Sequence, residues 1–363
     1  MTTVLENISL FTDSGESLPS FVSTGGYQGA EQKFIELLNI DNLDREIESN
    51  RGITHGFDAY IDKALREAYE ENSNFANLFL QRVLYRINRL NLFWYDDLSN
   101  YKNERSFYLQ SVRNKIENRW QAWELKNFDL AALQNSDVKE ELLKRGAADL
   151  HPPVTPSKAY LTDTMSVEGY RYLLAVASLD GLVEASRMSR ILGGASNEVQ
   201  ATLIRVLLEE YGNGRLHKKH STFFAQMMAE LGLNTEPEYY FHLAPWELLA
   251  SINHNFLLTE CKQHFLRYNG GLTYFEIVGP SIYEDYKAAA RRLNLSETAM
   301  GYWTLHIKED ERHGQWMLED VALALTHKYP HAAWEILLGY DQEKWMGDRA
   351  GNAVIRLIKQ FET

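Results

Sequence analysis

Residues 306–313 read His306-Ile307-Lys308-Glu309-Asp310-Glu311-Arg312-His313, and they place two histidines and an aspartate at helical spacing. An α-helix advances about 100° per residue, so Asp310 and His313 return to within about 40° of His306. Trp303 and Met317, on either side, indicate that this face is turned toward the protein core. A buried stripe of ionisable groups needs partners or a metal ion. The stretch therefore predicts a helix that carries ligands for a divalent transition metal, with a polar, solvated helix face as the alternative.

A second candidate motif lies earlier in the chain, in Glu209-Glu210-Tyr211-Gly212-Asn213-Gly214-Arg215-Leu216-His217-Lys218-Lys219-His220. Its candidate ligands are Glu210, His217 and His220. On a continuous helix His217 returns to within about 20° of Glu210, whereas His220 lies about 80° away unless the glycines distort the helix. Taken alone, such residues near a helix end are more often surface groups.

Two isolated glutamates, Glu184 and Glu276, lie among apolar residues that predict helices. Either one alone is more simply interpreted as pointing to solvent, because a glutamate is costly to bury unpaired. Together with the two motifs they complete a set of four carboxylates and three histidines on four or five helices. That set is typical of a carboxylate-bridged di-iron site in a helical bundle. A ferritin-like site fits poorly, because the usual pair of Glu-x-x-His motifs is missing and Asp310-x-x-His313 is the nearest analogue.

Apolar residues recur at spacings of three and four along most of the 363 residues, which predicts an all-α fold. A Ser-, Gly- and Thr-rich lead over residues 1–27 is expected to be flexible, and a helical region is expected over 28–150. The proline-rich segment His151-Pro152-Pro153-Val154-Thr155-Pro156 is the candidate linker to a second domain, residues 151–363. The helices expected in that domain cover residues 166–192, 197–211, 218–231, 245–268, 272–277, 281–293, 296–327 and 332–361.

Composition argues against several classes of protein. A formal net charge of −13 disfavours a nucleic-acid-binding surface, which needs a basic patch. No window reaches the roughly 18 apolar residues of a membrane-spanning helix. The single cysteine, Cys261, rules out an internal disulfide and a cysteine-based metal site, and it fits a reducing, cytoplasmic setting.

In order and spacing these residues resemble the haem-oxygenase-like di-iron oxidases and oxygenases. The resemblance covers roughly residues 155–330, and within the family it is greatest to the di-iron domain of N-oxygenases that form N-nitrosoureas. The matching elements are Glu184, Glu210-x9-His220 with Phe223-Phe224, Glu276, Arg291-Arg292-Leu293-Asn294-Leu295 and His306-x3-Asp310-x2-His313-Gly314. The resemblance implies a haem-oxygenase-like bundle for residues 151–363. It also implies an N-terminal helical extension, and the aromatic-rich helices of this extension are expected to mediate a homodimer.

The resemblance also implies two iron ions and a role for each candidate ligand. Glu210 would bridge the ions and act in catalysis. His217 is a further candidate for catalysis, and it could ligate an ion, form a hydrogen bond or face solvent. One ion would be held by His220, Glu276 and His306, and the other by Glu184, Asp310 and His313. In the N-oxygenases a glutamate occupies the position of His217, so this chain departs from the family there.

The reaction expected from the resemblance is O2-dependent hydroxylation of a nitrogen, in an amino acid or in an amine or guanidine derived from one, as a step of natural-product biosynthesis. O2 would be the co-substrate, and an external donor would supply electrons. The candidates for binding a substrate carboxylate are Arg205, Arg215, Arg291 and Arg292. Two alternatives stay open. The same site could cleave a C–C bond or desaturate an amino acid or a fatty-acid-like substrate, or the chain could be a non-enzymatic iron-binding or interaction protein.

Overall fold

The computed structural model describes residues 18–92, 97–194 and 197–362, and these residues form helices and no strand, which confirms the expected all-α class. Short 3₁₀ segments and one π-helix, Met317–Ala322 (η10), join the α-helices. The α-helices are Gln28–Leu38 (α1), Leu43–Ser49 (α2), Gly52–Tyr69 (α3), Asn74–Asn88 (α4), Phe107–Glu124 (α5), Leu130–Gln134 (α6), Val138–Asp149 (α7), Pro156–Asp163 (α8), Val167–Gly181 (α9), Asn197–Glu210 (α10), His220–Glu230 (α11), Trp246–Glu260 (α12), Phe265–Arg292 (α13), Gly301–Trp316 (α14), Leu323–Lys328 (α15) and Trp334–Glu362 (α16).

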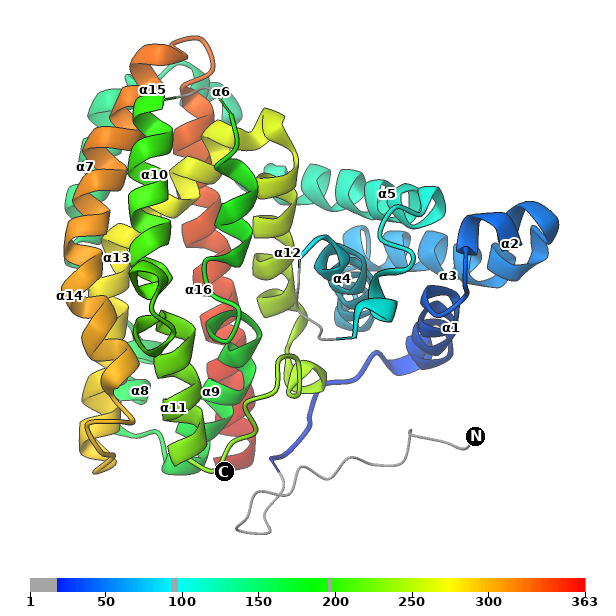
Figure 1. The fold of residues 1–363 in the computed structure, drawn as a ribbon, viewed down its shortest axis with the longest axis horizontal. Coiled ribbons are helices and arrows are strands. Elements are labelled where there is room, and N and C mark those ends of the chain that lie inside the picture. The colour runs from blue at the N-terminus through cyan, green and yellow to red at the C-terminus, as the bar shows by residue number, and fades with distance from the viewer. Residues whose placement is uncertain (1–17, 93–96, 195–196, 363) are drawn as a thin grey trace.

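Helices α1–α5 lie together on one side of a bundle of longer helices (Figure 1). Their core contains stacked aromatic rings, such as Phe34 and Phe57 with centroids 5.1 Å apart. Helix α12 packs against both α4 and α16 and so joins the two parts. On α12, the buried Asn253 side chain donates to the backbone carbonyl and the side-chain oxygen of Gln81, each at 2.9 Å. These two buried hydrogen bonds connect α12 to α4 where the two parts meet.

Some helices that precede the proline-rich segment pack with the bundle. Helix α7 packs against α13 and α16, and α6 packs against α16, so both belong with the bundle. Residues 130–149 therefore pack with the bundle, although they precede the proline-rich segment. Of the expected flexible lead, residues 1–17 lie outside the described residues, and Thr24 and Tyr27 are buried.

The two longest helices, α13 and α16, pack against each other at the centre of the bundle, and α14 packs along α13. From the sequence, the helix over 272–277 either continues or bends at Gly279-Pro280, and the structure shows that α13 continues through both residues. A Cβ atom on Gly279 would lie 2.7 Å from Oδ2 of Asp310, so the absence of a side chain there lets α14 bring its aspartate against α13. Pro280 also lacks the amide that would bond the carbonyl of Glu276, four residues earlier.

Several predicted helix ends are wrong, and two of them affect the site. Helix α9 ends at Gly181 instead of Leu192, and a turn with Ala185 in the left-handed region (φ 54°) follows. The predicted helices over 245–268 and 296–327 are also too long, since α12 ends at Glu260 and α14 begins at Gly301.

The break after α10 falls where the sequence places three turn residues. Gly212, Asn213 and Gly214 have φ angles of 60°, 52° and 77°. A Cβ atom on Gly212 would lie 2.4 Å from the carbonyl carbon of Lys218, so only glycine fits this turn. Helix α11 then starts at His220, and the chain between α10 and α11 is not a continuous helix.

Across the part of the chain that the structure describes, every helix is too short or too polar to cross a membrane.

Candidate metal centre

Seven predicted ligands converge inside the bundle from five different segments. Glu184 lies in the turn after α9, Glu210 is the last residue of α10, and His220 is the first residue of α11. Glu276 lies in the middle of α13, and α14 contributes the remaining three. Six of them are at most 7% exposed, and the Glu184 side chain is 14% exposed. The six are Glu210, His220, Glu276, His306, Asp310 and His313.

One group of potential ligands consists of Glu184, Glu210, His220 and His306, each with a donor atom within 4.8 Å of the others. His306 Nε2 lies 3.1 Å from Glu184 Oε1 and 3.0 Å from His220 Nδ1. His220 Nδ1 is 2.9 Å from Glu210 Oε2. Two imidazole nitrogens and two carboxylates thus face a common point.

A second group consists of Glu210, Asp310 and His313, again with donor atoms within 4.8 Å. Three carboxylates surround His313 Nδ1, with Glu276 Oε2 at 3.3 Å, Glu210 Oε1 at 3.7 Å and Asp310 Oδ1 at 3.8 Å. Glu276 therefore belongs beside this group.

Glu210 joins the two groups. Its Oε2 atom faces His220 in the first group, and its Oε1 atom faces His313 in the second. A carboxylate with one oxygen directed at each of two ligand clusters has the arrangement of a bridging ligand.

Buried donor atoms without hydrogen-bond partners show that the residues present fit metal ions. Both carboxylate oxygens of Asp310, one oxygen of Glu184 and Nδ1 of His313 are buried and have no hydrogen-bond partner in the structure. Unsatisfied carboxylates are expensive to bury. Metal ions would satisfy all of these atoms, and mixed imidazole and carboxylate donors suit iron.

The charges of the cluster shift the pKa values of its members. Burial lowers the pKa of His220, but hydrogen bonds to Glu210 and Glu309 outweigh burial and raise it to about 11. Burial likewise lowers the pKa of His313, and contact with Glu276 raises it to about 9. For Asp310, burial and then the charges of Glu276 and Glu210 raise the pKa well above its usual range. The raised pKa values keep protons on these side chains, and metal ions that bind to the cluster would displace those protons.

The outer nitrogen of each histidine is held by an oxygen atom. His220 Nε2 donates to Glu309 Oε2 at 3.0 Å, and His313 Nε2 donates to Glu209 Oε2 at 2.9 Å. His306 Nδ1 donates to the backbone carbonyl of Tyr302 at 3.0 Å. These oxygens can only accept, so each outer nitrogen carries the hydrogen and leaves the inner nitrogen's lone pair for a metal.

Sequence reasoning missed Glu209 and Glu309, although each lies next to a predicted ligand in the chain. Glu209, Glu309 and His313 also form a third group of donor atoms within 4.8 Å. However, Arg312 already neutralises Glu209 at 2.9 Å, and His220 bonds Glu309. These two carboxylates therefore orient histidines rather than provide a further metal position.

Replacing Glu309 by glutamine should weaken metal binding about 10- to 100-fold, because an amide cannot hold the His220 ring as strongly as a carboxylate does. Competition with a chelator, followed by metal analysis, measures the loss. Glu311→Gln is the matched control, since Glu311 is exposed on the same helix. Equal metal affinity in both variants would contradict the role of Glu309.

The grouping of ligands differs from the one that the family resemblance implies. Glu184 lies with His220 and His306, and Glu276 lies with His313, so the two glutamates have exchanged places. The early end of α9 is the physical reason for the position of Glu184. The turn over 182–185 brings its carboxylate to Tyr302, whose hydroxyl donates to Glu184 Oε1 at 2.6 Å.

His217 does not join the cluster. It lies in a 3₁₀ turn, Leu216–Lys218 (η7), where its side chain is exposed, and it is in none of the ligand groups found among the described residues. The expectation rested on a continuous helix from Glu210, and the glycine turn at 212–214 breaks that helix. The predicted catalytic role of His217 therefore has no structural basis.

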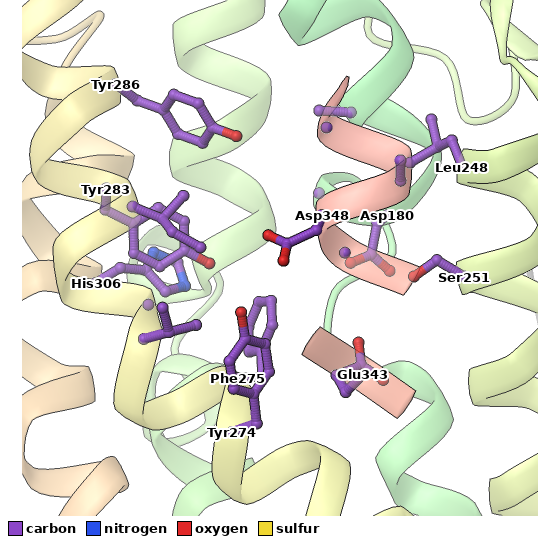
Figure 2. A pocket seen from close by; sticks show the side chains of 18 of the residues that line it. Asp180, Leu248, Ser251, Tyr274, Phe275, Tyr283, Tyr286, His306, Glu343 and Asp348 are labelled. Atoms are coloured by element: carbon purple, nitrogen blue, oxygen red, sulfur yellow. The ribbon is translucent and has the colours of Figure 1, made fainter. Parts of the chain in front are cut away.

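A cavity of about 890 Å³ opens beside the metal cluster, and Glu184, Glu210, Glu276, His306 and Asp310 line part of it. Figure 2 shows His306 and Tyr283 on one wall, with side chains of α16 on the opposite wall. None of the four arginines expected to bind a substrate carboxylate lines the cavity. Arg205 stacks on Trp316, and Arg292 donates to backbone carbonyls. The cations that do line it are Lys158 and Arg187.

Comparison with known proteins places these ligands within a family. Residues 171–343 match the family described as "Iron-containing redox enzyme". The chain is also 24% identical over 304 residues to the nitrosourea synthase of Streptomyces achromogenes subsp. streptozoticus, an alignment that covers 80% of this chain. It spans 64% of the length of that relative. The matched residues 171–343 contain all seven predicted metal ligands, so the part of the chain that is similar to the iron-containing redox enzymes is the part that forms this cluster.

Proposed function

We propose that this protein is an O2-dependent di-iron oxygenase that hydroxylates a nitrogen atom of an amine, a guanidine or an amino acid. The observation that carries the proposal is Glu210, whose two oxygens face two separate clusters of histidine and carboxylate donors. When bound, iron supplies the redox chemistry that reduces O2. In balanced form, R–NH2, O2, two electrons and two protons give R–NHOH and water, with the electrons coming from an external donor.

The residues of the chain would hold and orient the reactants. Glu184, His220 and His306 would hold one ion, Asp310, His313 and Glu276 the other, with Glu210 between them. The Tyr302 hydroxyl fixes the Glu184 carboxylate, and Tyr283 packs 4.9 Å from the His306 ring, measured between ring centroids. Closely packed aromatic walls keep bulk water from the reacting atoms.

The charge of the cavity favours a nitrogen substrate over a fatty-acid-like one. Eight carboxylates line it, against the two side-chain cations Lys158 and Arg187. An acidic lining attracts basic amines and repels fatty acids. The name of the similar protein says that it makes a nitrosourea, and nitrogen oxygenation by this chain remains our proposal.

The proposal is tested by loading the protein anaerobically with Fe(II), mixing it with O2 labelled with ¹⁸O, and analysing candidate amines by mass spectrometry. We expect a product one labelled oxygen atom heavier, with a new N–O bond. A product that has lost carbon or hydrogen instead would point to C–C cleavage or desaturation. Protein that takes up no Fe(II) and consumes no O2 would contradict the oxygenase altogether.

We also propose that the helices α1–α5 mediate a homodimer, and exposed apolar side chains support this. Leu98 and Phe107 are 66% and 84% exposed. Light scattering at micromolar concentration should give the mass of a dimer, and Leu98→Ser with Phe107→Ser should shift it toward a monomer. Val154→Ser serves as control, because Val154 is 72% exposed outside this region. A monomeric parent protein would contradict the dimer.

A further inference from the structure

The cavity continues beyond the metal cluster to two carboxylates on α16, Glu343 and Asp348. Figure 2 shows both on the wall opposite Tyr283 and His306, with the Asp348 carboxylate directed across the cavity. Asp348 is an exposed residue, and its position on the cavity wall places it within reach of a molecule inside.

These two carboxylates have no partner among the described residues, unlike two other acids that line the cavity. Asp180 pairs with Arg187, and Asp285 pairs with Lys158 at 3.0 Å. Within residues 18–92, 97–194 and 197–362, Glu343 and Asp348 form no hydrogen bond or ion pair.

The nearby cations are already engaged. Lys344, on the same helix, pairs with Asp149 at 2.5 Å. Arg187, besides its pair with Asp180, donates through Nε to Asn255 at 2.9 Å. Burial and the charge of Asp180 raise the pKa of Glu343 to about 7, which reflects the cost of a carboxylate without its own cation.

Two buried tyrosines independently indicate a polar ligand in this cavity. Tyr274 and Tyr283 are 7% and 6% exposed, and both line it. Their hydroxyls form no hydrogen bond with the described residues, and Figure 2 shows both directed into the cavity. Burial, and then the charges of Asp348, Asp149 and Glu343, raise the pKa of Tyr274, so its hydroxyl lies close to the α16 carboxylates. Both hydroxyls are accessible from the cavity, so a polar group of a bound molecule can form hydrogen bonds with them there.

The formal charges of the side chains that line the cavity indicate that the ligand is cationic. The lining has eight carboxylates and two side-chain cations, a formal excess of six negative charges. Two Fe(II) ions would add four positive charges and leave about two negative charges uncompensated. These are the charges of Glu343, which is half-buried, and Asp348, and a cationic ligand would compensate both.

We propose that Glu343 and Asp348 bind a second basic nitrogen of the substrate, so that the substrate is an aliphatic compound with two cationic nitrogen centres. One nitrogen would lie at the metal cluster and the other between the α16 carboxylates, with Tyr274 and Tyr283 along the chain between them. An ammonium or guanidinium group donates charge-assisted hydrogen bonds to carboxylates and stacks on aromatic rings. Only the placement of one nitrogen at the metal cluster rests on the proposed function.

The test is calorimetric titration of the Fe(II)-loaded protein, without O2, with 1,4-diaminobutane, 1,5-diaminopentane and agmatine, and with 1-aminobutane and 1-aminopentane as matched monoamines. At least one diamine or agmatine should bind at least about tenfold more tightly than its monoamine, because a charged hydrogen bond is worth about that much. Glu343→Gln and Asp348→Asn should each lower the affinity for the dication roughly 10- to 100-fold. The affinity for the monoamine should stay within roughly threefold of the parent.

Glu284→Gln is the control, since Glu284 is an exposed carboxylate on α13 outside the cavity lining. Iron content and circular dichroism of every variant show that the metal cluster and the fold are intact. Dications that bind no more tightly than monoamines, or α16 variants that behave like Glu284→Gln, would overturn the inference.

Product analysis separates this inference from the proposed function. If dications bind through Glu343 and Asp348 but yield no N–O product, the binding site is supported and the proposed N-oxygenase activity is contradicted. If monoamines are oxygenated and their turnover is unchanged in the α16 variants, the N-oxygenase is supported and the second binding site is contradicted.

Discussion

Glu210→Ala should bind close to no iron and show no turnover, whereas every other single ligand variant should retain one occupied position. Glu210 is the one side chain in both ligand groups, with Oε2 toward His220 and Oε1 toward His313. Loss of an outer-sphere partner typically costs 10- to 100-fold in metal affinity, so loss of a ligand shared by both positions should cost more than about a hundredfold at each. Anaerobic Fe(II) titration with a colorimetric iron assay measures the number of ions per chain.

Glu198→Ala is the matched control, because Glu198 is an exposed carboxylate in the first turn of the same helix. It should bind iron like the parent. If Glu210→Ala still bound two ions with near-parent affinity, Glu210 would not be a shared ligand and the di-iron centre proposed here would be wrong.

The second prediction concerns which glutamate belongs to which position, and it uses double variants. Glu184 and His306 lie in the same group, 3.1 Å apart, so removing both should empty one position and leave the other occupied by one ion. Glu276 lies 3.3 Å from His313, in the other group. Removing Glu276 together with His306 should therefore damage both positions and leave close to no iron.

The family resemblance implies the opposite result, because it pairs Glu276 with His306 and Glu184 with His313. One bound ion in Glu276→Ala/His306→Ala and none in Glu184→Ala/His306→Ala would show that the two glutamates bind as the resemblance implies. Circular dichroism of the two double variants and of the three corresponding single variants controls for unfolding.

The helical class and the convergence of the seven candidate ligands could be predicted from the sequence, for identifiable reasons. His306, Asp310 and His313 lie within one helix, so their common face follows from helical periodicity alone. Their burial is consistent with the apolar flanks at Trp303 and Met317. Glu184 and Glu276 could be selected only together with the two motifs, because each one alone is more simply interpreted as pointing to solvent.

Predictions that needed the path of the backbone were less successful. His217 was placed near Glu210 by assuming one helix, and three left-handed residues turn the chain away instead. The end of α9 at Gly181 likewise depends on packing, since a Cβ atom there would lie 2.6 Å from the Phe224 ring. Glu343 and Asp348 gave no signal, because charged residues on a long helix are common and only the folded cavity shows that these two lack partners.

The segment between Glu210 and His220 has a consequence for finding further proteins of this kind. The two ligands are the last residue of one helix and the first residue of the next, so the helices α10 and α11 set their positions. Outside the turn at Gly212, where only glycine fits, the residues between the two ligands can change in number and composition without moving either ligand, as surface connections generally do. Genome searches that require a fixed spacing between this glutamate and histidine would overlook such relatives, whereas searches anchored on the ends of the two helices would recover them.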